Sequence, residues 1–102
     1  MMAKVPVKIK RGLTPPFVAA WVPTYRTIVF APSTVITARL LAHELCHVIQ
    51  AENNKPWPWT YISQWMRSGF SYTNMPFEVE ARRAEKNQWY LSWASDLLRD
   101  IT

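Results

Sequence analysis

The sequence predicts an α+β fold, in which a small sheet of short N-terminal strands packs on a helical core. Two patterns support this prediction. Runs that alternate or are rich in β-branched residues lie within residues 4–30, whereas apolar residues from position 35 onward recur at helical spacing. The 102 residues are 49% hydrophobic, which allows one core and not two. We therefore expect a single domain over residues 1–102.

Two segments carry strand patterns. Residues 4–10 alternate between apolar and polar side chains, and Pro6 favours a sheet edge or a strand start. Tyr25–Phe30 is β-branched and aromatic and lies between two prolines, which predicts a second strand. Leu13–Val22 stays open between two interpretations, because Pro15-Pro16 could begin a short helix or the segment could remain extended.

Three helices are expected after the strands. Ser33 or Thr34 caps the first, which runs from about Val35 to Ala51. The second covers Pro58–Arg67, and the last covers about Pro76–Arg99, with proline at an early position. The side chains expected to pack are Leu41, Leu45, Val48 and Ile49 in the first helix, Tyr61, Ile62, Trp65 and Met66 in the second, and Phe77, Ala81, Ala84, Trp89, Leu91, Trp93, Leu97 and Leu98 in the last.

Composition narrows the classes of partner. The net charge is +5, but the basic residues are spread, and the cluster Lys4, Lys8, Lys10 and Arg11 favours a solvated strand face over a nucleic-acid arm. The single cysteine, Cys46, excludes an intramolecular disulfide and fits a reducing compartment. No run approaches the ~20 apolar residues of a membrane span, and the N-terminal residues do not read as a signal peptide. We expect a cytoplasmic protein with no membrane or nucleic-acid partner.

The most informative stretch is His43-Glu44-x-x-His47, the HExxH motif of zinc peptidases, and it contains both histidines of the chain. On a helix the two histidines lie one turn apart on the same face and can reach one metal ion. Glu44 lies about 100° round the helix from His43, where it could polarise a metal-bound water. Catalytic zinc usually has three protein ligands, so the motif is one ligand short.

Two places were considered for the third ligand. Cys46 is the nearest soft ligand, but its direction is skewed away from the histidines, and packing explains it better. Glu78-x-x-Ala81 resembles the glutamate motif of gluzincin peptidases, and phage or bacterial domains reading HELxHVxQ followed by PxExEA look similar over about residues 27–86. The resemblance implies a zincin-like fold in which the HExxH helix and a long C-terminal helix form the metal site. It implies Zn²⁺ as cofactor, His43, His47 and Glu78 as its ligands and Glu44 as general base.

Two neighbours of Glu78 leave questions open. Glu80 is a competing ligand, but it lies about 200° from Glu78 on a helix, so only one of them can face the metal; the family pattern favours Glu78. Many family members have Asp or Asn directly after the small residue, where Asp can brace a zinc histidine, and here that residue is Arg82. The brace would then come from a backbone carbonyl or another acid such as Glu52. Arg82 could pair with Glu78 or contact the oxyanion of the reaction.

The resemblance implies a zinc metallopeptidase that hydrolyses peptide bonds in a peptide or protein substrate, with Glu44 taking the proton of the water. Tyr72, and then Tyr61, are candidate oxyanion donors, and the Tyr25–Phe30 strand is expected to offer the edge on which an extended peptide docks. The alternative is a non-catalytic structural or interaction protein, for example a phage-encoded one, that zinc only stabilises. Arg82 and the short chain favour this alternative, whereas the intact Glu44 disfavours it. The natural substrate and the oligomeric state stay open.

Overall fold

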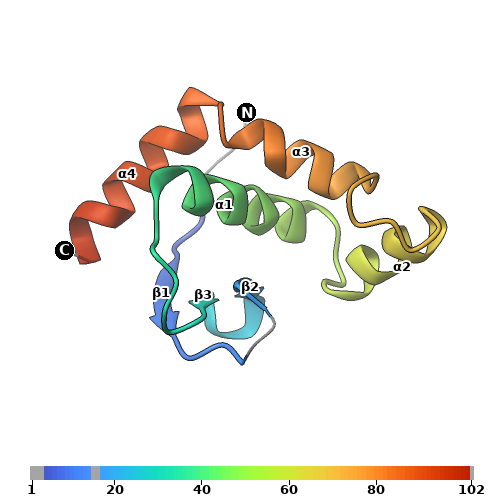
Figure 1. Ribbon diagram of the computed structural model, residues 1–102, viewed down its shortest axis with the longest axis horizontal. Helices are drawn as coiled ribbons and strands as arrows, with labels where there is room; N and C mark the ends of the chain where they lie inside the picture. The colour runs from blue at the N-terminus through green and yellow to red at the C-terminus, as the bar shows by residue number, and fades with distance from the viewer. Residues whose placement is uncertain (1–3, 15–16, 102) are drawn as a thin grey trace.

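The structure is a computed structural model that describes residues 4–14 and 17–101. Along these residues the elements are β1 (Lys8–Arg11), β2 (Ala19–Val22), the 3₁₀ turn η1 (Pro23–Tyr25), β3 (Thr27–Phe30), α1 (Ala38–Asn53), α2 (Trp59–Arg67), α3 (Pro76–Ala84) and α4 (Gln88–Ile101). Figure 1 shows α1 in the middle, with the sheet on one side of it and α3 and α4 on the other. The predicted class, a small N-terminal sheet on a helical core, is confirmed.

The sheet has the strand order β1-β3-β2, with β1 parallel and β2 antiparallel to β3. β3 is therefore the central strand, and Ile28 and Phe30 on it are completely buried. This makes the prediction that the Tyr25–Phe30 strand offers a docking edge wrong, because both sides of β3 are already hydrogen-bonded. The outer sides of β1 and β2 are the edges of the sheet.

The strands are shorter than the sequence pattern predicts. Tyr25 belongs to the 3₁₀ turn, and Arg26 adopts a left-handed conformation with φ of 49°, so β3 begins only at Thr27. Within the open segment Leu13–Val22, the extended interpretation holds for β2, whereas Pro15-Pro16 lies outside the described residues. β1 is an edge strand, as Pro6 indicated, although the part of residues 4–10 before Lys8 is not in the sheet.

Helix α1 begins later than predicted. The backbone N–H of Leu40 donates to Oγ1 of Thr37 at 3.1 Å, and the backbone of Thr37 is extended, which makes Thr37 the N-cap. The predictions of a cap at Ser33 or Thr34 and of a start at Val35 are therefore wrong. The predicted apolar face is confirmed, since Leu41, Leu45, Val48 and Ile49 all belong to the buried core.

The predicted single helix over Pro76–Arg99 is two helices, α3 and α4. Oδ1 of Asn87 accepts from the backbone N–H groups of Trp89 at 2.9 Å and Tyr90 at 3.4 Å, which satisfies the free donors of a new helix start. Because of this break, α4 buries a different face from the one predicted for the second half of a single helix. Tyr90 and Ala94 join Trp93 in the core, whereas Leu91, Leu97 and Leu98 are only partly buried.

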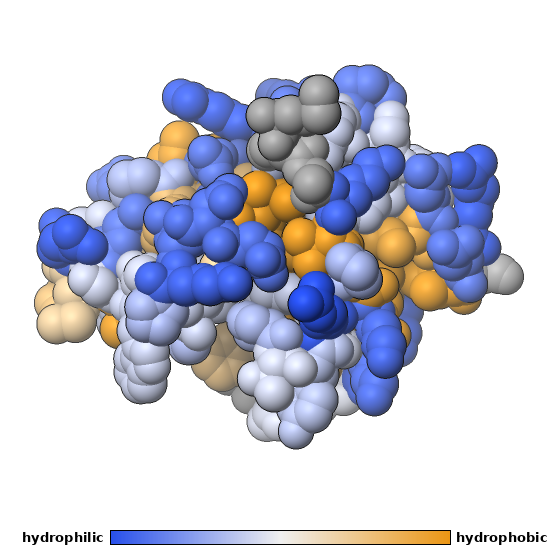
Figure 2. Space-filling model, turned by 180° about the vertical axis from the view of Figure 1, so that it is seen from behind, coloured by the Kyte–Doolittle hydropathy of each residue, from blue (hydrophilic) through white to orange (hydrophobic). Residues whose placement is uncertain are grey.

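Helix α2 is confirmed almost as predicted, but its packing is not. It contains no buried residue, and Ile62, Trp65 and Met66 are 37%, 38% and 56% exposed. The surface also carries hydrophobic side chains away from α2. Figure 2 shows an orange patch of them among hydrophilic residues. Within the described residues, none of the helices has the length and apolar character needed to cross a bilayer.

Candidate metal centre

The structure brings His43, His47 and Glu78 together. The two histidine rings lie one turn apart on α1, with their centroids 5.1 Å from each other. Glu78 lies in the first turn of α3, and its side chain is almost completely buried. Its Oε1 lies 3.0 Å from Nε2 of His43 and its Oε2 lies 3.2 Å from Nε2 of His47. Both Nε2 atoms therefore point to the same carboxylate.

A second carboxylate, that of Glu44, faces the same imidazoles. His43, Glu44 and His47 each offer a ligand atom, and these three atoms all lie within 4.8 Å of one another. Glu44 is 8% exposed. Glu44 thus lies close enough to both histidines to share a metal ion with them. Glu78 makes the direct contacts, because its two oxygens approach the two Nε2 atoms. An ion at this place would thus meet two imidazoles and two acids.

The outer nitrogens of both histidines are also engaged. Nδ1 of His43 donates to Oε2 of Glu85 at 2.9 Å, and Nδ1 of His47 donates to Oε1 of Gln50 at 2.8 Å. The suggestion that Glu52 braces a histidine is wrong, because Glu52 pairs with Lys55 at 3.8 Å. Bracing through Nδ1 leaves Nε2 as the metal-binding atom of each ring.

Sequence reasoning missed Gln50 and Glu85, although their spacing carries a signal. Gln50 follows His47 by about one helical turn and so lies on the same face of α1 as the ring it assists. Glu85 follows Glu78 by about two turns, which places it on the same face of its own segment as Glu78, the face that α1 packs against. Glu85 lies three residues after Arg82, the position at which the sequence resemblance implies a bracing acid.

Glu80 and Arg82 point elsewhere. Oε1 of Glu80 accepts from Nε2 of Gln50 at 2.9 Å and lies 3.6 Å from Sγ of Cys46, and no hydrogen bond joins it to the histidines within the described chain. Arg82 donates to the carbonyl oxygen of Thr73 and makes no ion pair with Glu78 in the described ranges, so the suggested pairing is wrong. Cys46 is fully buried, as expected for a packing residue.

The electrostatics of the site favour positive charge between the acids. Burial lowers the pKa of His43, but hydrogen bonds to Glu78 and Glu85 outweigh it and raise this pKa to about 9. Burial would raise the pKa of Glu78, but its hydrogen bonds with His43 and His47 dominate and hold it well below the usual range. Burial raises the pKa of Glu44. The carboxylates attract positive charge to the Nε2 atoms, and either a proton or a metal ion could supply that charge.

Two cavities meet at Glu44. The first, which we call the His47 cavity, has a volume of about 360 Å³ and includes the small residues Ala19 and Ala20 of the edge strand β2. The second, the His43 cavity, has a volume of about 470 Å³. The His47 cavity is also lined by Trp57, Tyr61, Tyr72 and Glu78, and the His43 cavity by Tyr72 and Glu85.

Aromatic side chains form the wall behind His47. The ring of Tyr61 stands edge-on to that of His47 with centroids 5.9 Å apart, and the ring of Trp57 lies 6.3 Å away. Tyr61 donates its hydroxyl hydrogen to Oε2 of Glu78 at 2.5 Å. Tyr72 borders both cavities and is 54% exposed. Burial and the nearby Glu78 raise the pKa of both tyrosines, so each keeps its proton at neutral pH and can donate it.

Comparisons of the chain with protein-family models, with curated proteins and with solved structures find no match.

Proposed function

We propose that this chain is a zinc-dependent metallopeptidase with a gluzincin-type site in a zincin-like fold. The observation that carries the proposal is the approach of Nε2 of His43 and His47 to one buried carboxylate, Glu78, at 3.0 and 3.2 Å. Two imidazoles and one carboxylate are the ligand set of many catalytic zinc ions, and both donor types suit zinc. A further acid, Glu44, lies beside this set, as a hydrolytic site requires.

In this proposal His43, His47 and Glu78 hold the zinc ion. When bound, the zinc supplies Lewis-acid chemistry that lowers the pKa of a water ligand. Glu44 takes the proton of the attacking water and then passes it to the leaving amine. Its position supports this role, because Glu44 borders both cavities, from which a water and a substrate could approach. Burial raises the pKa of Glu44 above its ordinary value, which makes its carboxylate a stronger base.

The peptide would dock on β2. This strand is a sheet edge, and its residues Ala19 and Ala20 line the His47 cavity beside Glu44. An extended peptide can add to such an edge through backbone hydrogen bonds. The aromatic wall of the cavity would then receive an apolar side chain of the substrate. Tyr72 is the better candidate to stabilise the oxyanion, because it borders both cavities beside Glu44, whereas Tyr61 borders only the His47 cavity and donates to Glu78 at 2.5 Å.

The test measures zinc content and hydrolysis together. The purified protein should bind one zinc ion per chain, and His43→Ala and Glu78→Ala should lose it. Glu44→Gln keeps the size of the side chain but not its basicity, so this variant should retain zinc and lose the cleavage of unfolded casein. Cleavage by Glu44→Gln at the wild-type rate would refute the mechanism.

A second function, that of a zinc-stabilised structural or interaction protein, is favoured by one observation. Helix α2 exposes Trp59 at 66% and Met66 at 56%, and Phe70 just after it at 60%. Exposed apolar groups of this kind are typical of protein-interaction surfaces. In this case the protein would bind zinc and gain stability from it but would cleave no peptide, and Glu44→Gln would change neither property.

A further inference from the structure

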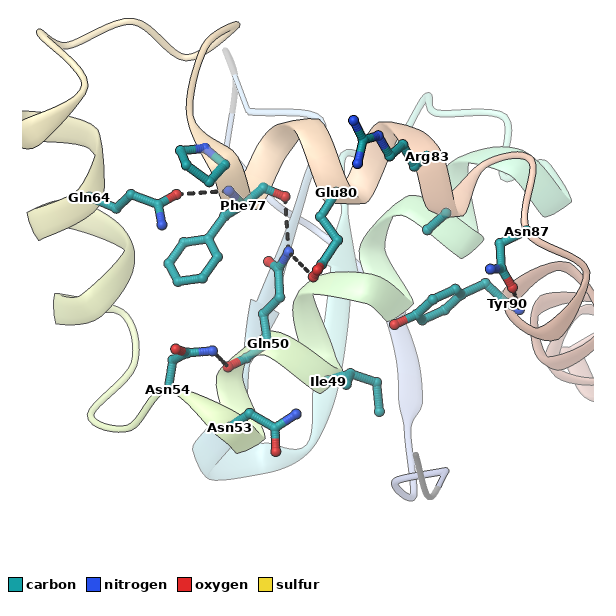
Figure 3. A pocket seen from close by; sticks show the side chains of 12 residues that line it. Ile49, Gln50, Asn53, Asn54, Gln64, Phe77, Glu80, Arg83, Asn87 and Tyr90 are labelled. Carbon is teal, nitrogen blue, oxygen red and sulfur yellow. Dashed lines mark hydrogen bonds between the residues drawn. The ribbon is translucent and has the colours of Figure 1, made fainter. Parts of the chain in front are cut away.

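Gln50 connects the candidate metal site to α3 through an unusually complete set of contacts. It lies about one turn after His47 on α1 and is 3% exposed. Its Oε1 lies 2.8 Å from Nδ1 of His47, while its Nε2 donates to the carbonyl oxygen of Phe77 and to Oε1 of Glu80, each at 2.9 Å. Figure 3 shows the amide of Gln50 turned toward these two acceptors on α3.

These contacts determine which way the amide of Gln50 points. Its nitrogen lies between a backbone carbonyl and a carboxylate, and both of these groups only accept hydrogen bonds. A reversed amide would place oxygen against two oxygens. Oε1 therefore faces His47, and because an amide oxygen also only accepts, Nδ1 of His47 must carry the hydrogen. In the neutral ring this leaves the lone pair on Nε2, the atom that faces Glu78.

The same network holds the beginning of α3. The backbone N–H of Phe77 donates to Oε1 of Gln64 at 2.7 Å, and its carbonyl accepts from Gln50, as Figure 3 shows. The N-cap residue of α3, Met75, has no side-chain cap hydrogen bond. Two glutamines, one from α1 and one from α2, therefore fix the peptide groups on either side of Phe77. Glu78 is the next residue.

We infer that Gln50 is a positioning residue of the metal site. It holds His47 in the tautomer that binds a metal through Nε2, and it ties α1 to the turn of α3 that carries Glu78. Glu80 serves this arrangement by accepting from Gln50 instead of binding the ion. The inference rests on the proposed zinc site, and it adds Gln50, supported by Glu80, to the residues that orient the ligands of that site.

The first test removes the amide. Gln50→Leu leaves a branched apolar side chain, one atom shorter than that of glutamine, which cannot accept from His47 or donate to Phe77. Loss of a group that orients a metal-binding histidine lowers metal affinity by about 10- to 100-fold. We expect this loss in zinc affinity, measured on folded protein by competition with a chromophoric chelator. Asn53→Leu is the matched control, because Asn53 and Gln50 line the same pocket, the one drawn in Figure 3. The Asn53→Leu variant should bind zinc like the wild type.

The second test is a rescue. Gln50→Glu can still accept from Nδ1 of His47, but its carboxylate would face that of Glu80 and could not donate to it. We expect a reduced zinc affinity for Gln50→Glu. Adding Glu80→Gln places a donor opposite the new carboxylate, so the double variant should recover the part of the lost affinity that comes from the contact with Glu80, while the hydrogen bond to the carbonyl of Phe77 stays lost. A side chain that only fills space would show no such recovery.

A spectroscopic signature distinguishes positioning from simple packing. In zinc-loaded, ¹⁵N-labelled protein the Nδ1 hydrogen of His47 should be visible and exchange slowly with water, and in Gln50→Leu it should exchange faster. Equal zinc affinities for the wild type, Gln50→Leu and Gln50→Glu would overturn the inference while leaving the zinc site intact. A wild-type protein that binds no zinc would instead overturn the proposed function, and this inference with it.

Discussion

Glu44 and Glu78 face the same pair of imidazoles, but their hydrogen bonds separate their roles. Both oxygens of Glu78 lie within 3.2 Å of a histidine nitrogen, and one also accepts from Tyr61. No hydrogen bond to the carboxylate of Glu44 is found within residues 4–14 and 17–101, and this residue borders both cavities. A ligand acid must be held in place, whereas a general base must be free to take a proton. The contacts match these requirements for Glu78 and Glu44 respectively.

The bracing of His43 leads to a prediction at the level of one side chain. Glu85 accepts from Nδ1 of His43 at 2.9 Å and also lies 3.6 Å from Arg39. Removing this acceptor by Glu85→Ala should weaken zinc binding by about 10-fold or more, since the orientation and basicity of His43 depend on it. Isothermal titration calorimetry or chelator competition measures the change.

Glu52→Ala is the control for this prediction, because it removes an acid from the same molecule but from a surface pair with Lys55. Its zinc affinity should equal that of the wild type. If both variants lose affinity equally, the effect comes from net charge and not from the hydrogen bond to His43.

The sequence predicts single residues well where the spacing lies within one helix. The spacing of His43, Glu44 and His47 predicts that they lie together on one side of α1, and their ligand atoms lie within 4.8 Å of one another. Glu78 is reached through a resemblance, and its position next to both histidines agrees with it. Glu85 acts on His43 across two helices, so its role depends on how α1 and α3 pack, which spacing along the chain does not specify.

Among the elements, α1 offers the clearest stability prediction. Oγ1 of Thr37 accepts from the backbone N–H of Leu40, so Thr37→Ala leaves a free donor at the start of the helix. The free energy of unfolding should fall by about 1 kcal/mol, which urea denaturation followed by circular dichroism can measure. Thr34→Ala is the control, since Thr34 lies before the helix and should change stability little. The opposite order of the two effects would show that the helix begins near Val35.

The division of the last helix shows why element boundaries were harder to predict than element types. The segment Glu85-Lys86-Asn87 contains neither glycine nor proline, and an apolar stripe can be drawn through it at helical spacing. Asn87 nevertheless ends that pattern, because its side chain caps a new helix. The two helices can then pack on α1 along different lines, which puts Tyr90 and Ala94 in the core.

At the scale of the whole molecule, the class of the fold follows from the change in periodicity along the chain, whereas the order of the strands does not. β1 and β3 pair in parallel although β2 lies between them in the sequence. This pairing makes β3 central and leaves β2 as the edge beside Glu44. Strand order is decided by contacts between distant segments, and short strands of four residues carry too little pattern to specify it.

A zinc ion bound at the proposed site would link distant parts of the molecule, and this can be tested by removing the metal. His43 and His47 lie on α1, Glu78 lies on α3, and Tyr61 joins α2 to Glu78. A ligand present at 100 times its dissociation constant stabilises the folded state by about 2.7 kcal/mol. For a chain of this size that corresponds to a change in melting temperature of about 10 to 20 °C.

We therefore expect EDTA to lower the melting temperature of the zinc-loaded protein by about this amount, and added zinc to restore it. Differential scanning calorimetry measures the shift. The variant His43→Ala is the matched control, because it lacks one ligand and should melt at the same temperature with and without EDTA. An equal shift in this variant would mean that the metal stabilises the fold from another place. No shift in the wild type would mean that packing and hydrogen bonds hold α1 and α3 together without a contribution from a metal.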